Sequence, residues 1–236
     1  MNGRIHSFQS LGTVDGPGVR CVIFAQGCPL RCVCCHNPDT WDPLGGERTD
    51  TETLLKKILR FRSYFGAEGG VTVSGGEPLL QAAFFTELFT KLKAAGIHTA
   101  LDTSGCRWND DVAALLRVTD LVLLDHKYPT EEEYRENARG SLRETERFLE
   151  ELQRRGIATW LRRVIIPGKT DTEASVRSLL AVAERYSVVE KIELLPFRDL
   201  CKEKYDALGL PFPLAGTKPP DSEVMEKLNA LLGDYK

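Results

Sequence analysis

Short runs of apolar and β-branched residues alternate with longer amphipathic stretches from about residue 50 onward. Short runs that are mostly apolar are typical of strands buried in a parallel sheet. The amphipathic stretches have the spacing of helices, and several begin with a Thr, Asp or Ser that can cap a helix. Together with one run before residue 50, the pattern predicts six strands, at 20–24, 70–74, 99–103, 121–125, 159–166 and 189–195.

The stretches between these strands predict the helices and, with them, the fold class. Helices are expected at 51–64, 79–95, 110–117, 130–138, 142–155, 172–186 and, closing the chain, about 222–232. Repeated β/α units build a parallel sheet, and a full eight-unit barrel needs about 250 residues. Six units in 236 residues predict an α/β fold, an open partial (β/α)6 TIM-like barrel, formed by residues 1–236 as a single domain.

Composition and charge exclude several classes of protein. The chain is 42% hydrophobic and 28% charged, which supplies a sizeable core and excludes a disordered protein. A net charge of −3 gives no electrostatic reason to expect nucleic acid or an anionic membrane as partner. The N-terminus lacks the apolar region of a secretory signal, and no apolar run approaches the roughly 20 residues of a membrane span. We therefore expect a cytoplasmic protein with no nucleic-acid or membrane partner.

Five of the seven cysteines lie in one short stretch, whereas a disulfide framework would scatter them. Cys28, Cys32 and Cys35, in the loop 26–40, have the spacing C-x3-C-x2-C. Three thiolates suit a 4Fe-4S cluster whose fourth iron stays open for another ligand. Two alternatives remain at this point, because Cys34 offers the rival spacing C-x3-C-x1-C and zinc also binds clustered cysteines. The fourth zinc ligand would be His36, Cys106 or Cys201.

Polar or glycine-rich segments follow four of the predicted strands, at 74–77, 102–105, 125–127 and 196–198. The carboxyl ends of parallel strands meet at one edge of the sheet, where ligands bind. Glycines in the first segment let the backbone approach a ligand closely. Asp102 and Asp125 end neighbouring strands, and a cation between them would keep both carboxylates charged.

The cysteine loop and its surroundings resemble those of one enzyme family. C-x3-C-x2-C is the spacing of the radical S-adenosylmethionine enzymes, and the accompanying motifs resemble those of the pyruvate formate-lyase activating enzymes. The resemblance covers nearly the whole chain. Motifs match in order at 3–7, 13–20, 35–41, 74–78, 96–99, 164–168 and 193–196. The family fold is an open barrel of six β/α units, the number that periodicity predicts.

The resemblance implies a cofactor, a reaction and a protein substrate. In the family, the cysteines matching Cys28, Cys32 and Cys35 hold a 4Fe-4S cluster, and S-adenosylmethionine binds its free iron. An electron from the cluster splits S-adenosylmethionine into methionine and a 5'-deoxyadenosyl radical, which takes a hydrogen atom from a glycine Cα in the glycine loop of pyruvate formate-lyase. The implied electron donor is flavodoxin or ferredoxin, and the implied oligomeric state is a monomer.

The resemblance also assigns site residues, none of them an acid–base catalyst. The cofactor-binding positions are Cys34, His36, Gly76, Asp102, Asp125, His126, Lys127 and Arg198. The family also binds a monovalent cation, Na⁺ or K⁺, in this region. The matching positions are Asp102, Thr103, the carbonyl of Leu123 and Asp125. The positions expected to meet the substrate peptide are Thr13, Asp15, His36 and Arg162.

Two positions depart from the family pattern. The family residue at Cys34 is usually aromatic, so only a backbone contact is expected there, and Arg198 replaces a histidine with a side chain of different charge and geometry. The interval 37–69 contains no cysteine, which favours pyruvate formate-lyase over the partners of activases that carry an inserted ferredoxin-like segment. The alternatives are an activase of another glycyl radical enzyme, a small-molecule enzyme such as the 7-carboxy-7-deazaguanine synthases, and a zinc-bound interaction module.

Overall fold

The computed structural model describes residues 1–235, which divide into two compact units. The first unit comprises Met1–Pro29 and Thr40–Leu123. The second comprises Leu30–Asp39 and the chain from Leu124 onward. The cysteine loop therefore contributes residues to both units.

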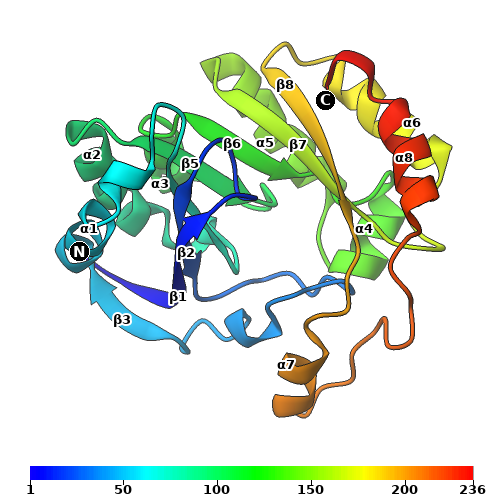
Figure 1. Ribbon diagram of the computed structural model, residues 1–236, viewed down its shortest axis with the longest axis horizontal. Helices are drawn as coiled ribbons and strands as arrows, with labels where there is room; N and C mark the ends of the chain where they lie inside the picture. The colour runs from blue at the N-terminus through cyan, green and yellow to red at the C-terminus, as the bar shows by residue number, and fades with distance from the viewer. Residues whose placement is uncertain (236) are drawn as a thin grey trace. The chain divides into compact units, whose positions relative to one another are not determined.

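The first unit contains five complete strands and three α-helices. Its elements are β1 (Asn2–Gly12), β2 (Arg20–Ala25), β3 (Glu47–Asp50), α1 (Thr51–Leu59), η2 (Arg62–Tyr64), β4 (Gly70–Gly75), η3 (Pro78–Gln81), α2 (Ala82–Ala94), β5 (His98–Thr103), α3 (Asp110–Leu116) and the start of β6 (Leu121–Asp125). Helix α2 packs between α1 and α3 (Figure 1). Val71 and Val73 of β4 are completely buried, so this strand forms part of the core of the unit.

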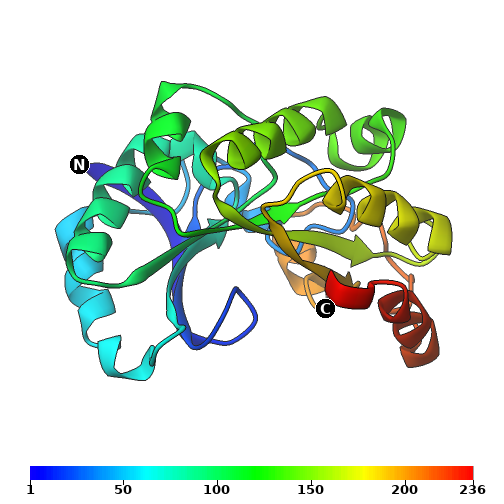
Figure 2. The same cartoon turned by 90° about the horizontal axis from the view of Figure 1, so that it is seen from above.

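The second unit contains two complete strands and five α-helices. Its elements are α4 (Glu131–Ala138), α5 (Leu142–Arg155), β7 (Ala158–Ile165), α6 (Glu173–Ala183), β8 (Val189–Pro196), α7 (Lys202–Ala207), α8 (Ser222–Ala230) and η4 (Gly233–Tyr235). A further turn, η1 (Pro38–Thr40), lies where the chain passes between the units. Helix α8 packs against β8 (Figure 2).

Six of the strands are those that the apolar runs predict, and two are additional. The strands hydrogen-bond in the order β3-β1-β2-β4-β5-β6-β7-β8. The pairs β2–β4, β4–β5 and β7–β8 are parallel, as predicted. The two additional strands are β1 and β3, and β1 pairs antiparallel with both β2 and β3. Strand β1 is half-exposed and β3 is short and polar, so neither has the apolar run that marks a buried parallel strand.

The predicted helices are present, with corrections at several ends. The helix expected at 51–64 ends at Leu59, and the one expected at 79–95 begins as the 3-10 turn η3 before α2. Helix α7 was not predicted, and its six residues are too few to show a helical period. Within the described part of the chain, every helix is too short or too polar to cross a membrane.

A buried arginine holds the loop between β1 and β2. Arg20 has no exposed surface, and its guanidinium donates hydrogen bonds to the carbonyls of Pro17 (3.0 Å) and Val71 (2.9 Å). Its Nε donates to Thr72 Oγ1 (2.7 Å), and that hydroxyl donates in turn to the carbonyl of Asp15 (2.6 Å). The backbone of the 13–18 loop is therefore attached to β4 through a satisfied buried cation.

Candidate functional site

The first half of the cysteine loop is held by backbone contacts within the first unit. The Gly27 amide donates to the carbonyl of Thr40 (2.7 Å), and the Cys28 amide donates to that of Trp41 (3.4 Å). The Gly27 carbonyl accepts from the Glu77 amide (2.8 Å). The segment after β4 and the segment after η1 therefore fix the position where Cys28 begins the motif.

The close approach of Gly76 to the backbone of the cysteine loop requires a glycine, independently of the predicted ligand contact. A Cβ atom at this position would lie 2.3 Å from the carbonyl oxygen of Gly27, which no side chain allows. Gly75 is similarly close to the backbone of β2 and has a φ of +107°, a conformation that glycine adopts without strain. The two glycines let the turn after β4 lie directly against the start of the cysteine loop.

Glu77 is a buried site residue to which the sequence analysis gave no role. Its carboxylate accepts hydrogen bonds from Thr103 Oγ1 (2.6 Å), from the amide of Ser104 (3.1 Å) and from the amide of Leu79 (3.2 Å). Cys106 Sγ lies 3.7 Å from the same carboxylate. An acidic residue just before a proline that starts a helical turn is the available signal, since such a residue can cap the turn.

Asp102 and Thr103, two predicted cation ligands, direct their side chains to different partners. Asp102 accepts from Ser74 Oγ (2.6 Å), whereas the hydroxyl of Thr103 donates to Glu77. Successive residues of a strand point to opposite faces, which explains the difference. Leu123 lies in the same unit and Asp125 in the other, so the set of four cation ligands stays a prediction.

The second half of the cysteine loop is held by α4 and α7 within the second unit. The amides of Arg31 and Val33 donate to the carbonyls of Ala138 and Asn137, both at 2.8 Å. These carbonyls lie at the end of α4, where no intrahelical donor is left for them. On the other side, the hydroxyl of Tyr205 donates to the carbonyl of Cys35 (3.3 Å).

His36 and Arg198, two predicted cofactor-binding residues, are brought together. His36 Nε2 lies 2.7 Å from the backbone carbonyl of Arg198, so the imidazole donates to it from that nitrogen. The Arg198 residue itself is exposed. The contact involves the backbone of residue 198, which an arginine and a histidine provide equally.

One cavity of the second unit is lined by four predicted site residues, Cys34, Asp125, Lys127 and Arg162. The remaining lining residues are Tyr128, Val164 and Ile166. The cavity is small, with about 20 Å³ available to the centres of water molecules, and it is partly open to solvent, so only part of a larger ligand would enter it. Three predicted cofactor-binding residues and Arg162, a predicted contact of the substrate peptide, therefore line the same cavity.

The charges around this cavity are paired. Lys127 Nζ lies 2.7 Å from Asp125 Oδ2, and Arg162 Nε lies 3.5 Å from Glu193 Oε2 on the neighbouring strand. Burial by itself lowers the pKa of Lys127, but the Asp125 carboxylate outweighs it and holds that pKa well above its ordinary value. Lys127 therefore stays protonated at the cavity as one half of an ion pair with Asp125.

The thiols of the second unit fit a soft metal centre. Desolvation raises the pKa of Cys32 to about 11 and also raises the pKa of Cys34, although Lys127 opposes both shifts. Thiols in such surroundings stay protonated until a metal binds and removes the proton. Cys28 lies in the first unit, and across residues 1–235 no three His, Cys, Asp or Glu side chains are already gathered as a metal site. The ligand set stays a prediction from the spacing.

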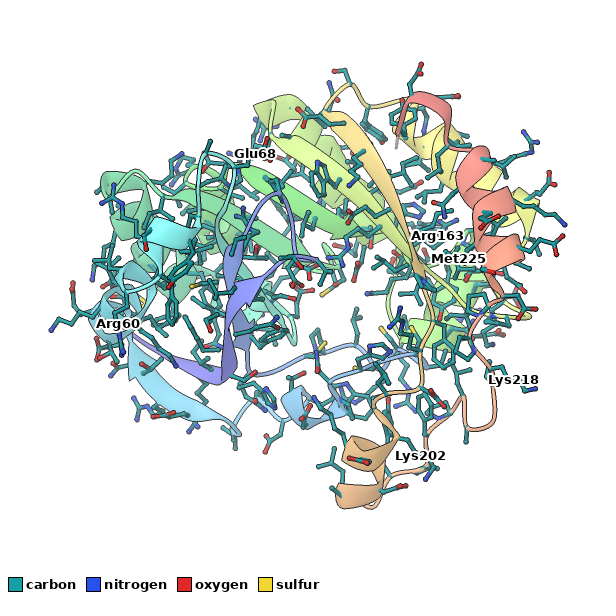
Figure 3. The ribbon with its side chains drawn as sticks, viewed as in Figure 1. Arg60, Glu68, Arg163, Lys202, Lys218 and Met225 are labelled. Carbon is teal, nitrogen blue, oxygen red and sulfur yellow. The ribbon has the colours of Figure 1, made fainter. Side chains whose placement is uncertain are left out.

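His126 lies beside the cavity residues, but its ring is bound by an arginine. Arg163, labelled in Figure 3, extends from β7 and is buried. It donates from Nε to the carbonyl of His126 (2.9 Å) and from Nη2 to His126 Nδ1 (2.7 Å). Because arginine can only donate, Nδ1 accepts and the ring proton is on Nε2. The predicted ligand contact of His126 stays a prediction.

The burial of His126 makes stability fall in acid. Desolvation, followed by the charge of Arg163, lowers the pKa of His126 to about 3, against about 6.5 in the unfolded chain. Between pH 6.5 and about pH 3, the His126 imidazole is protonated in the unfolded state but neutral in the folded state. We expect the free energy of unfolding to fall through this window by up to about 1.4 kcal/mol per pH unit.

Urea unfolding at several pH values checks this prediction, with His126→Gln as the comparison. Glutamine keeps an acceptor for Arg163 but does not titrate. The pKa of His98 is also lowered, by burial and then by Arg20, so a smaller acid dependence in the same direction remains in the variant. Equal pH dependence in the two proteins would contradict the assignment to His126.

Comparisons with known proteins place these features in one family. Residues 14–145 match the family described as "4Fe-4S single cluster domain". The chain is 44% identical to the Pyruvate formate-lyase 1-activating enzyme of Escherichia coli strain K12, over 99% of this chain and 96% of that protein. It is also 44% identical to the Pyruvate formate-lyase-activating enzyme of Clostridium pasteurianum, over 98% of this chain and 97% of that protein.

Among solved structures, one similar fold is that of Streptococcus suis SuiB bound to the precursor peptide SuiA. The TM-score is 0.69 at 12% sequence identity, over 91% of this chain and 45% of that chain. This likeness bears on the fold, and it confirms the predicted α/β class with a mostly parallel sheet.

Proposed function

We infer that this chain, which belongs to the family of pyruvate formate-lyase-activating enzymes, is a radical S-adenosylmethionine enzyme that installs the glycyl radical of pyruvate formate-lyase. The family implies both the 4Fe-4S cluster and S-adenosylmethionine. The observation that carries the proposal is the cavity at Cys34, Asp125, Lys127 and Arg162, because it joins a residue of the cluster loop to charged groups that suit a zwitterionic ligand.

The following residues are the proposed ligands of the cofactors. Cys28, Cys32 and Cys35 supply three thiolates to the cluster, and Lys127 supplies a cation for the carboxylate of S-adenosylmethionine. When bound, the cluster would supply one electron for the reductive cleavage of S-adenosylmethionine. The protein's own residues bind and orient this ligand: Gly76 by its backbone, Asp102 and Asp125 by their carboxylates, and His36, Cys34, His126 and Arg198 at the predicted contacts.

Several finer parts of the proposal concern ions and partners. Asp102, Thr103, the Leu123 carbonyl and Asp125 are proposed to bind Na⁺ or K⁺, because a cation would balance carboxylates placed near a ligand. Flavodoxin or ferredoxin is the proposed electron donor. The proposed state is a cytoplasmic monomer that meets pyruvate formate-lyase transiently.

Thr13, Asp15, His36 and Arg162 are the proposed contacts of the substrate peptide. Support for Asp15 comes from its backbone, because Thr72 holds the carbonyl of Asp15 while Arg20 holds that of Pro17. A loop fixed in this way presents its side chains without a further loss of backbone freedom. Support for Arg162 comes from its place at the cavity, where Glu193 orients it.

Asp15→Ala is expected to separate the two stages of the reaction. The substitution removes a carboxylate but keeps the backbone contacts of the loop, so cleavage of S-adenosylmethionine should stay within about twofold of wild type while activation of pyruvate formate-lyase falls about tenfold or more. Quantifying 5'-deoxyadenosine without the partner, and the glycyl radical with it, measures the two stages. The exposed Glu47→Ala on β3 is the matched control. Equal losses in both stages would contradict a role in contacting the substrate.

The enzymatic proposal is tested most simply by metal content and product. The anaerobically reconstituted protein should bind about four irons per chain and, with a reductant, convert S-adenosylmethionine to 5'-deoxyadenosine and methionine. One tightly bound zinc, with no iron and no cleavage, would instead support the interaction module.

A further inference from the structure

Tyr128 is a buried residue of the second unit to which the proposed mechanism gives no role. It follows β6 by three positions, is 2% exposed and lines the cavity with Cys34, Asp125, Lys127 and Arg162. Within residues 1–235, its hydroxyl has no hydrogen-bond partner. A buried hydroxyl without a protein partner is unfavourable unless a water or a ligand bonds to it, so its presence at a cavity needs an explanation.

The neighbouring Tyr134 is a buried tyrosine whose hydroxyl has protein hydrogen-bond partners, so it serves as a comparison for Tyr128. Its ring meets that of Tyr128 edge to face, with centroids 6.0 Å apart, and it is 1% exposed. Its hydroxyl accepts from the Lys127 amide (2.9 Å) and donates to the Asp125 carbonyl (3.2 Å). Tyr134 therefore uses both hydrogen-bonding roles within the protein, whereas Tyr128 uses neither.

The chemistry of Tyr128 suits a donor to a ligand. Burial raises the pKa of Tyr128, so the phenol keeps its proton at any working pH. It lies beside Lys127, which is positively charged, and beside the apolar Val164 and Ile166. A protonated phenol next to a cation offers hydrogen-bond donors to an acceptor on the ligand, such as a carboxylate or hydroxyl oxygen.

We propose that Tyr128 is a further ligand-binding residue, whose hydroxyl donates a hydrogen bond to S-adenosylmethionine in this cavity. The inference rests on the proposed function, since it names a contact of the same ligand. The rival explanation is an ordered water on the hydroxyl that stays in place when the ligand binds. The two explanations predict different effects of removing the oxygen.

The test compares Tyr128→Phe with Tyr134→Phe, using equilibrium binding of S-adenosylmethionine to the oxidised, cluster-loaded protein and thermal unfolding without ligand. Tyr128→Phe should raise the dissociation constant about three- to tenfold, the loss expected for one hydrogen bond. Its melting temperature without ligand should be unchanged or higher, because an unsatisfied hydroxyl has been removed. Tyr134→Phe should lower the melting temperature, because the Lys127 amide and Asp125 carbonyl lose their partner.

The outcomes separate this inference from the proposed function. Wild-type affinity in Tyr128→Phe overturns the role of Tyr128 and leaves the proposed function intact. A lower melting temperature in Tyr128→Phe with unchanged affinity identifies a structural water and also overturns it. If the wild-type protein with its cluster does not bind S-adenosylmethionine, the proposed function fails and this inference fails with it.

Discussion

Replacing Cys28, Cys32 or Cys35 singly by alanine is expected to abolish binding of the 4Fe-4S cluster, whereas Cys34→Ala retains it. In the proposed site, each of the three cysteines would supply the thiolate of one iron corner, and the fourth corner would be left for S-adenosylmethionine. A cluster with only two protein ligands lacks the support that holds it. Iron and acid-labile sulfide content, together with the visible absorption of the reconstituted variants, measure the effect, which should be near-complete loss.

Cys34→Ala is the matched control because Cys34 is adjacent to a predicted ligand and equally able to bind iron. The structure places Cys34 at the cavity with Asp125 and Lys127. Only a backbone contact with the ligand is expected at this position and alanine keeps the backbone, so iron content and affinity for S-adenosylmethionine should both stay close to wild type. Loss of the cluster in Cys34→Ala and its retention in Cys35→Ala would show that the C-x3-C-x1-C spacing is the correct one.

Arg163→Met is expected to destabilise the protein by about 2–4 kcal/mol, because several buried acceptors lose their donor at once. The guanidinium donates to the carbonyls of His126 and Ser175 and to His126 Nδ1. Burial lowers the pKa of Arg163 to about 10, so the residue remains charged at neutral pH and strengthens these bonds. Methionine fills a similar volume but satisfies none of the acceptors.

Urea unfolding at neutral pH measures this loss, with Arg154→Met as the control. Arg154 is an exposed residue of α5 that pairs with Glu151, and its replacement should leave stability unchanged within error. Unchanged or greater stability in Arg163→Met would mean that the cost of burying the charge exceeds the value of its hydrogen bonds.

The elements and the family could be predicted from the sequence because their signals are local. The six parallel strands are short apolar runs, and the motifs around Cys28, Gly76 and Asp125 are short and ordered along the chain. Strands β1 and β3 were not predicted because β1 is half-exposed and β3 is a short polar edge strand, so neither has a continuous apolar run.

The roles of individual buried polar residues could not be predicted because they depend on tertiary partners. Arg20 and Arg163 lie within predicted strands, yet nothing near them in sequence shows that Thr72, Val71 or His126 would accept their hydrogen bonds. Glu77 was visible as part of a motif, but its contact with Thr103 requires the neighbouring strand. Tyr128 and Tyr134 are both buried tyrosines that differ in the partners of their hydroxyls, which the sequence does not reveal.

The central claim is the transfer of a radical to a glycine of pyruvate formate-lyase, and electron paramagnetic resonance tests it most directly. The anaerobically reconstituted, reduced protein should show a cluster signal that changes when S-adenosylmethionine is added. Addition of pyruvate formate-lyase should then produce the doublet of a glycyl radical on that partner. A cluster that responds to S-adenosylmethionine but yields no doublet would contradict pyruvate formate-lyase as the substrate, and the absence of any iron signal would contradict the mechanism as a whole.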